Sequence, residues 1–437
     1  MSNGLSVKIR GLSLLYDTNE VLRSLDLELG SGEIILITGY SGSGKTSLLR
    51  ILLGSIPKIF PGVINGYFQP DIEVLNKLTF YLPQEPWFGV ASPYVWSEIS
   101  TVAKIPDINT VGKVLDKFDL SHLINRSTYT LSAGEIQRIL IILALLSNKR
   151  ILLLDEPTSY LDEHNANLFV ELVSRLSREM GVGLVIIDHR IDLWSRYVDN
   201  IYVLDKGKIE DYSNSSYEKI YRLYIDKIHS LKRDLAGERR DRCLEFRMSG
   251  FKYPGSGRLL LRELEGELCY GNIILIKGPS GSGKSTLLKI LIERILDKRY
   301  RDEVYIKYRN ISEGKVKRDI MYIPDNPLLF FTEPTVNEEL SGSIDLLKKL
   351  GVPENRSSLS IKRLSSGERR RVALLSAVAR GGRLLFIDEP TVGLDPYNKY
   401  LYLRFIRELA SEKNYGFIIA SHDPHIELIA DEIIRIN

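Results

Sequence analysis

Two glycine-rich loops in this chain have the composition and spacing of phosphate-binding loops. The first runs from Gly39 to Thr46 as GYSGSGKT, and the second from Gly278 to Ser285 as GPSGSGKS. Each follows an apolar segment and precedes a helical one. In that context, backbone N–H groups bind phosphate oxygens, the lysine reaches the β- and γ-phosphates, and the hydroxyl side chain binds Mg²⁺. The sequence therefore predicts two nucleotide-binding units in one chain.

The predicted phosphate ligands are the residues of these loops and of the helix starts behind them. In the first half they are Gly39, Ser41, Gly42, Gly44, Lys45, Thr46 and Ser47. In the second half they are Gly278, Ser280, Gly281, Gly283, Lys284, Ser285 and Thr286. Among them, the hydroxyls of Thr46 and Ser285 are the expected Mg²⁺ ligands.

The composition is that of an ordinary soluble globular protein. The chain has 437 residues, of which 26% are charged and 44% hydrophobic, with a net charge of +3. This charge is too small to indicate binding to nucleic acid. The longest apolar run, Ile139–Leu146, is far shorter than the roughly 18–20 residues that span a bilayer. Any action at a membrane is expected to take place at its surface.

The two cysteines, Cys243 and Cys269, lie far apart and lack the spacing of a metal site. This cysteine usage fits a reducing compartment and argues against a disulfide framework or an iron–sulfur domain. Glutamine is rare while Lys, Arg, Glu and Ile are plentiful, which fits either a thermophilic origin or a compositional bias of the lineage.

Further motifs repeat behind each loop at matching intervals. A Leu-Ser-x-Gly-Glu segment begins at Leu131 in half one and at Leu364 in half two. From its serine to an Asp that ends an apolar segment is 23 residues in both halves (132 to 155, 365 to 388). From the following Glu to a His is 33 residues in both (156 to 189, 389 to 422). Helical segments such as Ala166–Glu179 and Asn398–Glu412 lie between the apolar ones, which is the alternation of a parallel α/β sheet.

The intervals also set the expected domain boundaries. We predict one domain over residues 1–215, a charged and partly helical linker over 216–242, and a second domain over 243–437. Apolar residues recur at helical spacing in the linker, so we expect a helix packed on the first domain and then a turn at Gly237. The RRDR run at its end is expected to be solvated, and the alternative is a docking patch for an anionic partner.

With these motifs in order, the sequence resembles the ATP-binding cassette family, whose signature reads LSGGQ with frequent variants. The resemblance covers nearly the whole chain, twice. It implies two P-loop NTPase domains, each with a mainly parallel sheet, a small antiparallel β subdomain and a helical subdomain that carries the signature. It also implies hydrolysis of ATP, with Mg²⁺ as the metal.

The family assigns roles to the carboxylates of the repeat. Asp155 and Asp388 end their strands where a carboxylate can hold the Mg²⁺ shell, directly or through water. Glu156 and Glu389 follow them, and the resemblance implies that each polarises the attacking water as a general base.

The family also places a switch histidine against the γ-phosphate and an aromatic side chain against adenine. The matching histidines are His189 and His422, where charge stabilisation serves phosphoryl transfer. The matching aromatics are Tyr16 and Tyr253, 29 and 31 residues before their lysines (16 to 45, 253 to 284). The alternative for these tyrosines is an ordinary place in the core or on an edge strand.

In the family, two cassettes face each other head to tail, and each ATP lies between the P-loop of one and the signature of the other. The resemblance therefore implies that Ser365 and Gly367 complete the site of the first half, while Ser132 and Gly134 complete that of the second. Because both halves belong to one chain, this pairing can close within the chain at high effective concentration.

One position differs between the halves. Half one has Tyr-Leu-Pro-Gln84, with the glutamine that in the family touches Mg²⁺ and the coupling surface, whereas half two has Tyr-Ile-Pro-Asp325. Aspartate is one carbon shorter and adds a negative charge, so Asp325 could bind Mg²⁺ more strongly or fail to reach it. In either case, the two sites are expected to differ.

Two segments resemble the energy-coupling factor ATPases, which serve importers of vitamins and of nickel or cobalt. They are LLGSIPKIFPGVINGYF, after the first P-loop helix, and PLLFFTEPTVNEEL, after Asp325. The resemblance implies a subunit at the cytoplasmic face of the membrane that grips coupling helices of an integral membrane partner, a helix-in-groove contact.

Two other functions stay open. One is a tandem sugar-importer ATPase, although such chains are usually longer. The other is a soluble cassette protein acting on ribosomes or DNA. Ribosomal members tend to carry a long charged linker or an iron–sulfur domain, and DNA-repair members carry large insertions, all of which this sequence lacks. No nucleic acid partner is therefore expected.

Overall fold

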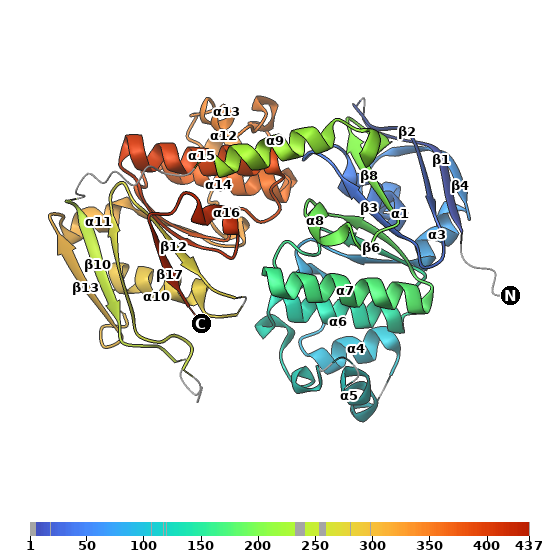
Figure 1. The fold of residues 1–437 in the computed structure, drawn as a ribbon, viewed down its shortest axis with the longest axis horizontal. Coiled ribbons are helices and arrows are strands. Elements are labelled where there is room, and N and C mark those ends of the chain that lie inside the picture. The colour runs from blue at the N-terminus through green and yellow to red at the C-terminus, as the bar shows by residue number, and fades with distance from the viewer. Residues whose placement is uncertain are drawn as a thin grey trace. The chain divides into compact units, whose positions relative to one another are not determined.

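A computed structural model describes residues 6–17, 19–105, 107–116, 118, 120–231, 241–252, 259–279, 281–297 and 299–436. The chain divides into two compact units, Met1–Lys219 (unit 1) and Ile220–Asn437 (unit 2). Each unit combines a mainly parallel sheet, a small antiparallel sheet and helices (Figure 1). The predicted α/β class, with its parallel core and antiparallel subdomain, is confirmed.

The elements of unit 1 follow the predicted alternation of strands and helices. In chain order they are β1 (Val7–Tyr16), β2 (Asn19–Leu29), β3 (Ile34–Thr38), α1 (Lys45–Leu53), α2 (Ser55–Lys58), β4 (Val63–Gln69), α3 (Ile72–Leu78), β5 (Thr79–Leu82), the 3₁₀ helix η1 (Pro86–Gly89), α4 (Val95–Ala103), α5 (Ile108–Asp116), η2 (Ser121–Leu123), η3 (Thr128–Thr130), α6 (Ala133–Leu146), β6 (Ile151–Asp155), α7 (Glu163–Met180), β7 (Gly183–Ile187), α8 (Ile191–Trp194), β8 (Asn200–Asp205), β9 (Lys208–Asp211), η4 (Tyr212–Asn214) and α9 (Tyr217–His229), which continues into unit 2.

Unit 1 has a six-stranded sheet in the order β5-β6-β7-β3-β8-β9, which is parallel except for the β8–β9 pair. Strands β3, β6 and β7 are dominated by Ile, Leu and Val and are buried along their whole length, as strands covered on both faces require. The small sheet, β2-β1-β4, is antiparallel. Helices α6 and α7 lie along one face of the parallel sheet, with α4 and α5 beyond α6 (Figure 1).

The elements of unit 2 repeat this plan. They are β10 (Cys243–Met248), β11 (Leu264–Cys269), β12 (Ile273–Lys277), α10 (Lys284–Leu296), β13 (Val304–Arg309), α11 (Glu313–Asp319), β14 (Ile320–Ile323), η5 (Pro327–Leu329), α12 (Val336–Glu339), α13 (Leu346–Lys349), η6 (Glu354–Arg356), η7 (Ile361–Arg363), α14 (Ser366–Ala379), β15 (Leu384–Asp388), α15 (Pro396–Lys413), β16 (Gly416–Ala420), α16 (Pro424–Glu427) and β17 (Glu432–Arg435).

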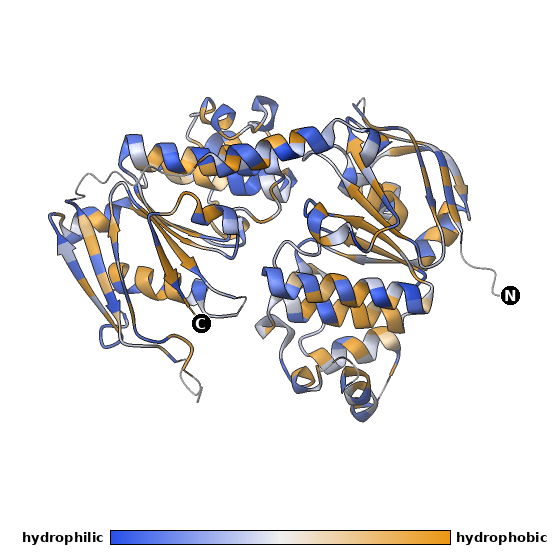
Figure 2. Cartoon of the chain, in the orientation of Figure 1, coloured by the Kyte–Doolittle hydropathy of each residue, from blue (hydrophilic) through white to orange (hydrophobic). Residues whose placement is uncertain are grey.

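The parallel sheet of unit 2 has the order β14-β15-β16-β12-β17, and the antiparallel sheet has the order β11-β10-β13. The parallel strands of both units are predominantly hydrophobic in Figure 2. In unit 2 the helix α10 is packed between the two sheets in one apolar cluster, and α14 and α15 cover the other face of the parallel sheet in a second cluster. The P-loop helix α1 occupies the place of α10 in unit 1.

The linker helix packs on the first unit, as the sequence analysis expected, at its first residue, Tyr217, whose ring lies edge-on against Tyr40. Helix α9 exists over Tyr217–His229, but Ile228 is fully buried in the apolar cluster of unit 2 rather than unit 1. The ring of Tyr224 also packs edge-on against Tyr397 of α15, with the ring centroids 4.9 Å apart. The helical periodicity located an apolar face correctly, yet it carried no information on which unit that face would contact. The turn expected at Gly237 lies outside the described residues.

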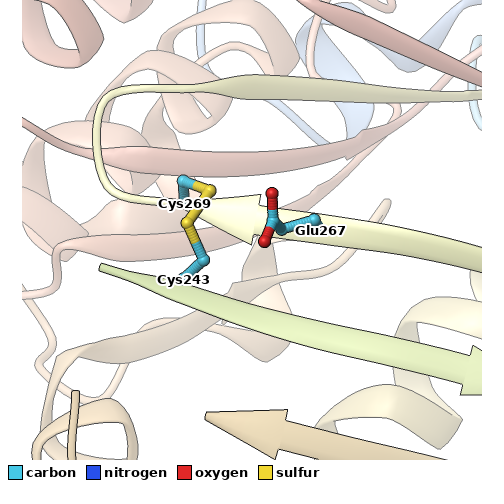
Figure 3. Close-up of side chains that lie close together, drawn as sticks. All are labelled: Cys243, Glu267 and Cys269. Atoms are coloured by element: carbon cyan, nitrogen blue, oxygen red, sulfur yellow. A yellow bond between two sulfur atoms is a disulfide. The ribbon is translucent and has the colours of Figure 1, made fainter. Parts of the chain in front are cut away.

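The two cysteines form a disulfide, so the prediction that argued against one is wrong. Cys243 is the first residue of β10 and Cys269 the last residue of β11, and the antiparallel register places them directly opposite each other (Figure 3). The cysteines are 26 residues apart, and only the strand register brings them together, so the sequence alone did not indicate this pairing. Both are almost fully buried, beside Glu267.

In the part of the chain that the structure describes, no helix combines the length and the apolar character needed to cross a bilayer.

We predict that the disulfide stabilises unit 2 by about 3 kcal/mol, because it closes a loop of 26 residues in the unfolded chain. Urea unfolding of the oxidised chain, the reduced chain and Cys243→Ser/Cys269→Ser, followed by circular dichroism, measures this difference. Unit 1 serves as the internal control. All three tryptophans lie in unit 1, so tryptophan fluorescence follows its unfolding, and the midpoint of that transition should not change. Equal unfolding midpoints for unit 2 with and without the disulfide would contradict the prediction.

Candidate active sites

Each P-loop connects a buried parallel strand to a helix, and its lysine is the first residue of that helix. Lys45 Nζ donates hydrogen bonds to the backbone oxygens of Gly39 and Tyr40, at 2.7 and 2.8 Å. Lys284 Nζ makes the matching bonds to Gly278 and Pro279, at 2.9 and 3.0 Å. Both ammonium groups are therefore held inside their own loops, at the start of helices whose N-terminal N–H groups attract anions.

Two glycines of the first loop are required by its geometry. Gly44 caps α1 with φ of 107°, a left-handed conformation that a side chain would strain. At Gly39, φ is 140° and an added Cβ would lie 2.2 Å from the backbone oxygen of Leu204. The loop can thus approach the neighbouring strand closely only because it carries no side chains at these points.

The predicted acidic and histidine residues meet the P-loop because the sheet is parallel. In unit 1, the P-loop, Asp155 and His189 follow the carboxyl ends of the adjacent strands β3, β6 and β7. In unit 2, the P-loop, Asp388 and His422 follow β12, β15 and β16 in the same way. The carboxyl edge of a parallel sheet is where α/β proteins bind ligands.

Asp155 and its neighbour Glu156 form a buried carboxylate pair in unit 1. Burial raises the pKa of Asp155 to about 6, and the negative charge of Glu156 adds to the rise. The hydroxyl of Tyr81 donates a hydrogen bond to Asp155 Oδ2 at 2.9 Å, and this bond lowers the pKa of Asp155 in opposition to burial. This tyrosine was not predicted, although the sequence places a tyrosine three residues before both Gln84 and Asp325.

Asp388 is the matching residue of unit 2, and burial raises its pKa to about 7. The hydroxyl of Ser285 opposes this rise, while the charges of Glu389 and Asp325 add to it. Neither carboxylate oxygen of Asp388 has a hydrogen bond partner of normal geometry in the described parts of the chain. A buried acceptor of this kind is costly unless a cation satisfies it.

Glu156 is held by three side chains of unit 1. Gln84 Nε2 donates to Glu156 Oε2 at 2.7 Å, and Ser159 Oγ donates to the same oxygen at 3.1 Å. His189 Nε2 lies 3.4 Å from Oε1. The backbone of Glu156 has φ of 44°, and left-handed backbone of this kind concentrates at functional sites.

Glu389 has the same backbone conformation, with φ of 46°, but different partners. His422 Nδ1 lies 2.9 Å from Glu389 Oε1, and Ser421 Oγ donates to Oε2 at 2.8 Å. Lys284 Nζ is 3.9 Å from Oε1. Burial is the largest effect on the pKa of Glu389 and raises it, but His422, Lys284 and Ser421 together bring the pKa below its usual value. Burial is also the largest effect on the pKa of His422 and lowers it, but Glu389 and Asp423 together raise the pKa above its usual value, so both shifts favour a charged pair.

The halves therefore differ around the position that the sequence analysis singled out. Gln84 reaches the catalytic candidate of its unit, as described above. In unit 2, the Asp325 carboxylate accepts a local hydrogen bond from the backbone N–H of Asn326 at 2.9 Å. Aspartate cannot donate a hydrogen bond when ionised, so it cannot replace the amide that holds Glu156.

Tyr16 ends β1, and its hydroxyl lies 3.4 Å from Ser47 Oγ in the first turn of α1. The ring is thus beside the P-loop helix, which is compatible with the predicted contact to adenine. The matching Tyr253, and Ser280 of the second P-loop, lie outside the described residues.

The signature serines begin helices, as the sequence patterns indicate. Ser132 and Ser365 cap α6 and α14, and each forms a capping box with the glutamate three residues later. The following Gly134 and Gly367 are packed closely: an added Cβ would lie 3.0 Å from Leu161 and 3.1 Å from Leu394. Leu161 belongs to residues 159–162 (the SYLD segment) and Leu394 to residues 392–395 (the VGLD segment), so the signature touches this segment within each unit.

The residues present fit a nucleotide with Mg²⁺. The lysine and the helix N-terminus supply positive potential for phosphates, and the open space around the Cβ position of Gly42 leaves the loop free to accept them. The buried oxygens of Asp388, beside the hydroxyl of Ser285, are hard ligands of the kind that Mg²⁺ prefers. Thr46, Gln84 and Asp155 are the residues of unit 1 that would supply the corresponding oxygens.

Fold and site together define a protein with two fused P-loop ATPase units. The family model described as ABC transporter matches residues 22–159 and 261–392. The chain belongs to the ABC transporter family and is an ATPase.

Individual relatives share the tandem arrangement. A protein of Sulfurisphaera tokodaii described as an ABC transporter ATP-binding protein is 30% identical, covering 98% of this chain and 96% of that protein. A Bacillus subtilis protein named as an HMP/thiamine import ATP-binding protein is 24% identical, covering 98% of this chain and 89% of the other. A model of ribosome-bound archaeal Pelota and ABCE1 contains a chain with a TM-score of 0.66 and 22% identity, covering 95% and 74% of the two chains. At this identity the structural likeness supports the fold alone.

We predict that Glu156→Gln and Glu389→Gln each retain ATP binding and slow hydrolysis in their own unit. Glutamine keeps the shape of the side chain but cannot accept a proton from water, which costs about 10²–10⁴-fold in that step. Rapid-quench hydrolysis and filter binding of ATP measure the two quantities, with exposed Glu163→Gln as the matched control. Wild-type hydrolysis by the doubly substituted chain would show that neither glutamate is the base.

We also predict that Asp325→Gln weakens Mg²⁺ binding at the unit 2 site by about tenfold, since it removes a negative charge that already acts on Asp388. Gln84→Asp should strengthen Mg²⁺ binding at the unit 1 site while it releases Glu156. Each site is isolated by Lys45→Ala or Lys284→Ala, and Mg²⁺ is titrated at fixed ATP. Identical Mg²⁺ curves for the two isolated wild-type sites would refute this difference.

Proposed function

We propose that the chain is the energy-coupling subunit of an ABC importer, and that it binds an integral membrane partner at the cytoplasmic face of the membrane. The observation that carries this proposal is a set of exposed apolar side chains directly behind Gln84 and Asp325. These two positions lie beside the ATP sites, so a partner bound there is well placed to respond to hydrolysis.

In unit 1 the exposed side chains are on η1, just before α4 and at the start of α4. Phe88 is 65% exposed, Tyr94 46% and Trp96 36%. In unit 2, Leu329 of η5 is 77% exposed and stands four residues after Asp325, as Phe88 stands four residues after Gln84. We call Phe88, Tyr94 and Trp96 the coupling surface of unit 1, and Leu329 is the matching exposed residue of unit 2. Aromatic and aliphatic anchors of this type bind short amphipathic helices.

The relatives support the importer proposal through their names and their length. The Bacillus subtilis relative is named for import of HMP or thiamine, and it matches nearly the whole chain. The segments after the first P-loop helix and after Asp325, which resemble energy-coupling factor ATPases, also support the importer proposal. The composite pairing of each P-loop with the signature of the other half remains a prediction from the family resemblance, and we include it in the proposal.

The rival functions are a sugar-importer ATPase and a soluble protein acting on ribosomes or DNA. Structural neighbours include ribosome-associated ABCE1, but the likeness supports only the fold. A sugar-importer ATPase would also bind a membrane protein, so this alternative differs from our proposal only in the substrate that is imported. The soluble alternative predicts a different class of partner, which makes it the sharper contrast.

We predict that the tagged chain, purified from detergent-solubilised native membranes, brings down a protein with several transmembrane segments. Phe88→Asp/Leu329→Asp should reduce its recovery by about tenfold or more, because truncating central apolar anchors costs at least about 2 kcal/mol. Leu168→Asp, on the exposed side of α7 at 51% exposure, is the matched control and should leave recovery unchanged. Recovery of ribosomal proteins without any membrane protein would overturn the importer proposal and favour the soluble alternative.

A further inference from the structure

Unit 1 contains an aromatic contact between two loops that flank its catalytic glutamate. The ring of Trp87, in η1, packs edge-on against Tyr160 of the SYLD segment, with the ring centroids 5.0 Å apart. Tyr160 is 8% exposed, whereas Phe88, next to Trp87, is 65% exposed. The contact therefore links the coupling surface to the buried side of the SYLD segment.

The two ends of this contact are adjacent to two of the three residues that hold Glu156. Ser159, which precedes Tyr160, and Gln84, three residues before Trp87, both donate hydrogen bonds to Glu156 Oε2. A shift of η1 relative to the SYLD segment would thus change both donors to the same carboxylate oxygen. In a packed interior such contacts transmit displacement, because side chains cannot slide freely past one another.

Unit 2 lacks every part of this arrangement. Counting from Asp325 and from Glu389, its residues at the matching positions are Leu328 and Gly393, which cannot form an aromatic pair, and Val392, which has no hydroxyl. Glu389 is held instead by Ser421 and His422, the residues that follow β16. The switch histidine lies against the glutamate in both units, but the amide and hydroxyl donors to Glu156 come from the residues just before η1 and from the SYLD segment, whereas the hydroxyl donor to Glu389 is Ser421, after β16.

A second contact ties the SYLD segment to the residue after the switch histidine, and it is built differently in unit 2. Arg190, which follows the switch histidine, has Nη1 at 3.5 and 3.4 Å from the backbone oxygens of Thr158 and Leu161. The corresponding residue of unit 2 is Asp423, which instead accepts hydrogen bonds from Thr391 and His425 and pairs with Lys399.

We propose that Trp87 and Tyr160 are positioning residues that set the geometry of Glu156, so that hydrolysis at the unit 1 site responds to the coupling surface while hydrolysis at the unit 2 site depends on its switch histidine. This inference rests on the proposed role of Glu156 as the base. It assigns different regulation to two sites that carry the same Lys, Asp, Glu and His set.

A double-mutant cycle tests the proposal in the full chain carrying Glu389→Gln, which leaves unit 1 as the hydrolysing site. Trp87→Leu and Tyr160→Leu should each lower the single-turnover rate constant by about three- to tenfold, the range expected for one aromatic pair. The ATP concentration for half-maximal rate should stay unchanged, since the proposed role of both rings is to position Glu156 and not to bind the nucleotide. The double variant should be no slower than the slower single variant.

Tyr160→Phe is the conservative control and should restore most of the rate, because the ring contact needs no hydroxyl. Leu328→Ala, at the position in unit 2 that matches Trp87, should leave the rate of unit 1 unchanged. Multiplicative losses in the double variant, or equal losses in Tyr160→Phe and Tyr160→Leu, would overturn the proposal. Circular dichroism and the unfolding midpoint identify any variant that fails to fold.

Fluorescence provides a second readout that does not depend on turnover. In Trp96→Phe/Glu156→Gln, which binds ATP without rapid hydrolysis at unit 1, Trp87 and buried Trp194 are the remaining tryptophans. Adding ATP with Mg²⁺ should change the emission, and Tyr160→Leu should abolish that change while Tyr160→Phe retains it. An emission change that is the same in all three chains would refute the coupling of Trp87 to the site.

The two proposals fail in different ways. If Glu156→Gln/Glu389→Gln hydrolyses ATP at the wild-type rate, the assignment of the base is wrong and the aromatic contact has no catalytic group to position. If the doubly substituted chain is inactive but the losses from Trp87→Leu and Tyr160→Leu multiply, the glutamates are still supported as the bases. Only the positioning role of the aromatic pair is then refuted.

Discussion

The structure of each site depends on a pair of adjacent carboxylates buried at the end of one parallel strand. Asp155 with Glu156, and Asp388 with Glu389, are both removed from water, and burying unpaired charge is costly. The sheet offsets this cost by bringing a lysine and a histidine to the same edge from the neighbouring strands. The raised pKa values of the two aspartates indicate that some of that cost is left for a cation to remove.

Much of this was predictable because the motifs report local geometry. A glycine-rich loop between a strand and a helix, and an acidic pair at a strand end, each fix backbone and side chain within a few residues, so Lys45, Asp155 and their counterparts were placed correctly on the elements. The parallel order of the strands then brings those elements together. The class of fold followed from the same alternation of buried strands and helices.

The features that the sequence could not predict are those set by which segments become neighbours in the folded chain. The disulfide arises from the strand register between β10 and β11, and the burial of α9 in unit 2 arises from tertiary packing. Tyr81 was missed although a tyrosine repeats at this position in both halves, because only the pairing of β5 with β6 brings its hydroxyl to Asp155. The disulfide does not exclude a cytoplasmic location, since intracellular disulfides are frequent in proteins of hyperthermophiles, an origin that the composition had allowed.

The difference between the two glutamates illustrates how a duplicated site can diverge without losing a catalytic group. In unit 1, two neutral donors, Gln84 and Ser159, hydrogen-bond to the carboxylate of Glu156, which also lies close to its switch histidine. Unit 2 has neither of these donors and holds Glu389 by a hydrogen bond from Ser421 and a charged contact with His422. A neutral hydrogen bond and an ion pair respond differently to added charge: a nearby phosphate competes directly for a protonated histidine but only weakly for an amide. Nucleotide binding should therefore release Glu389 from His422 while leaving Glu156 with its donors, which makes the two sites unequal from the first step of the cycle.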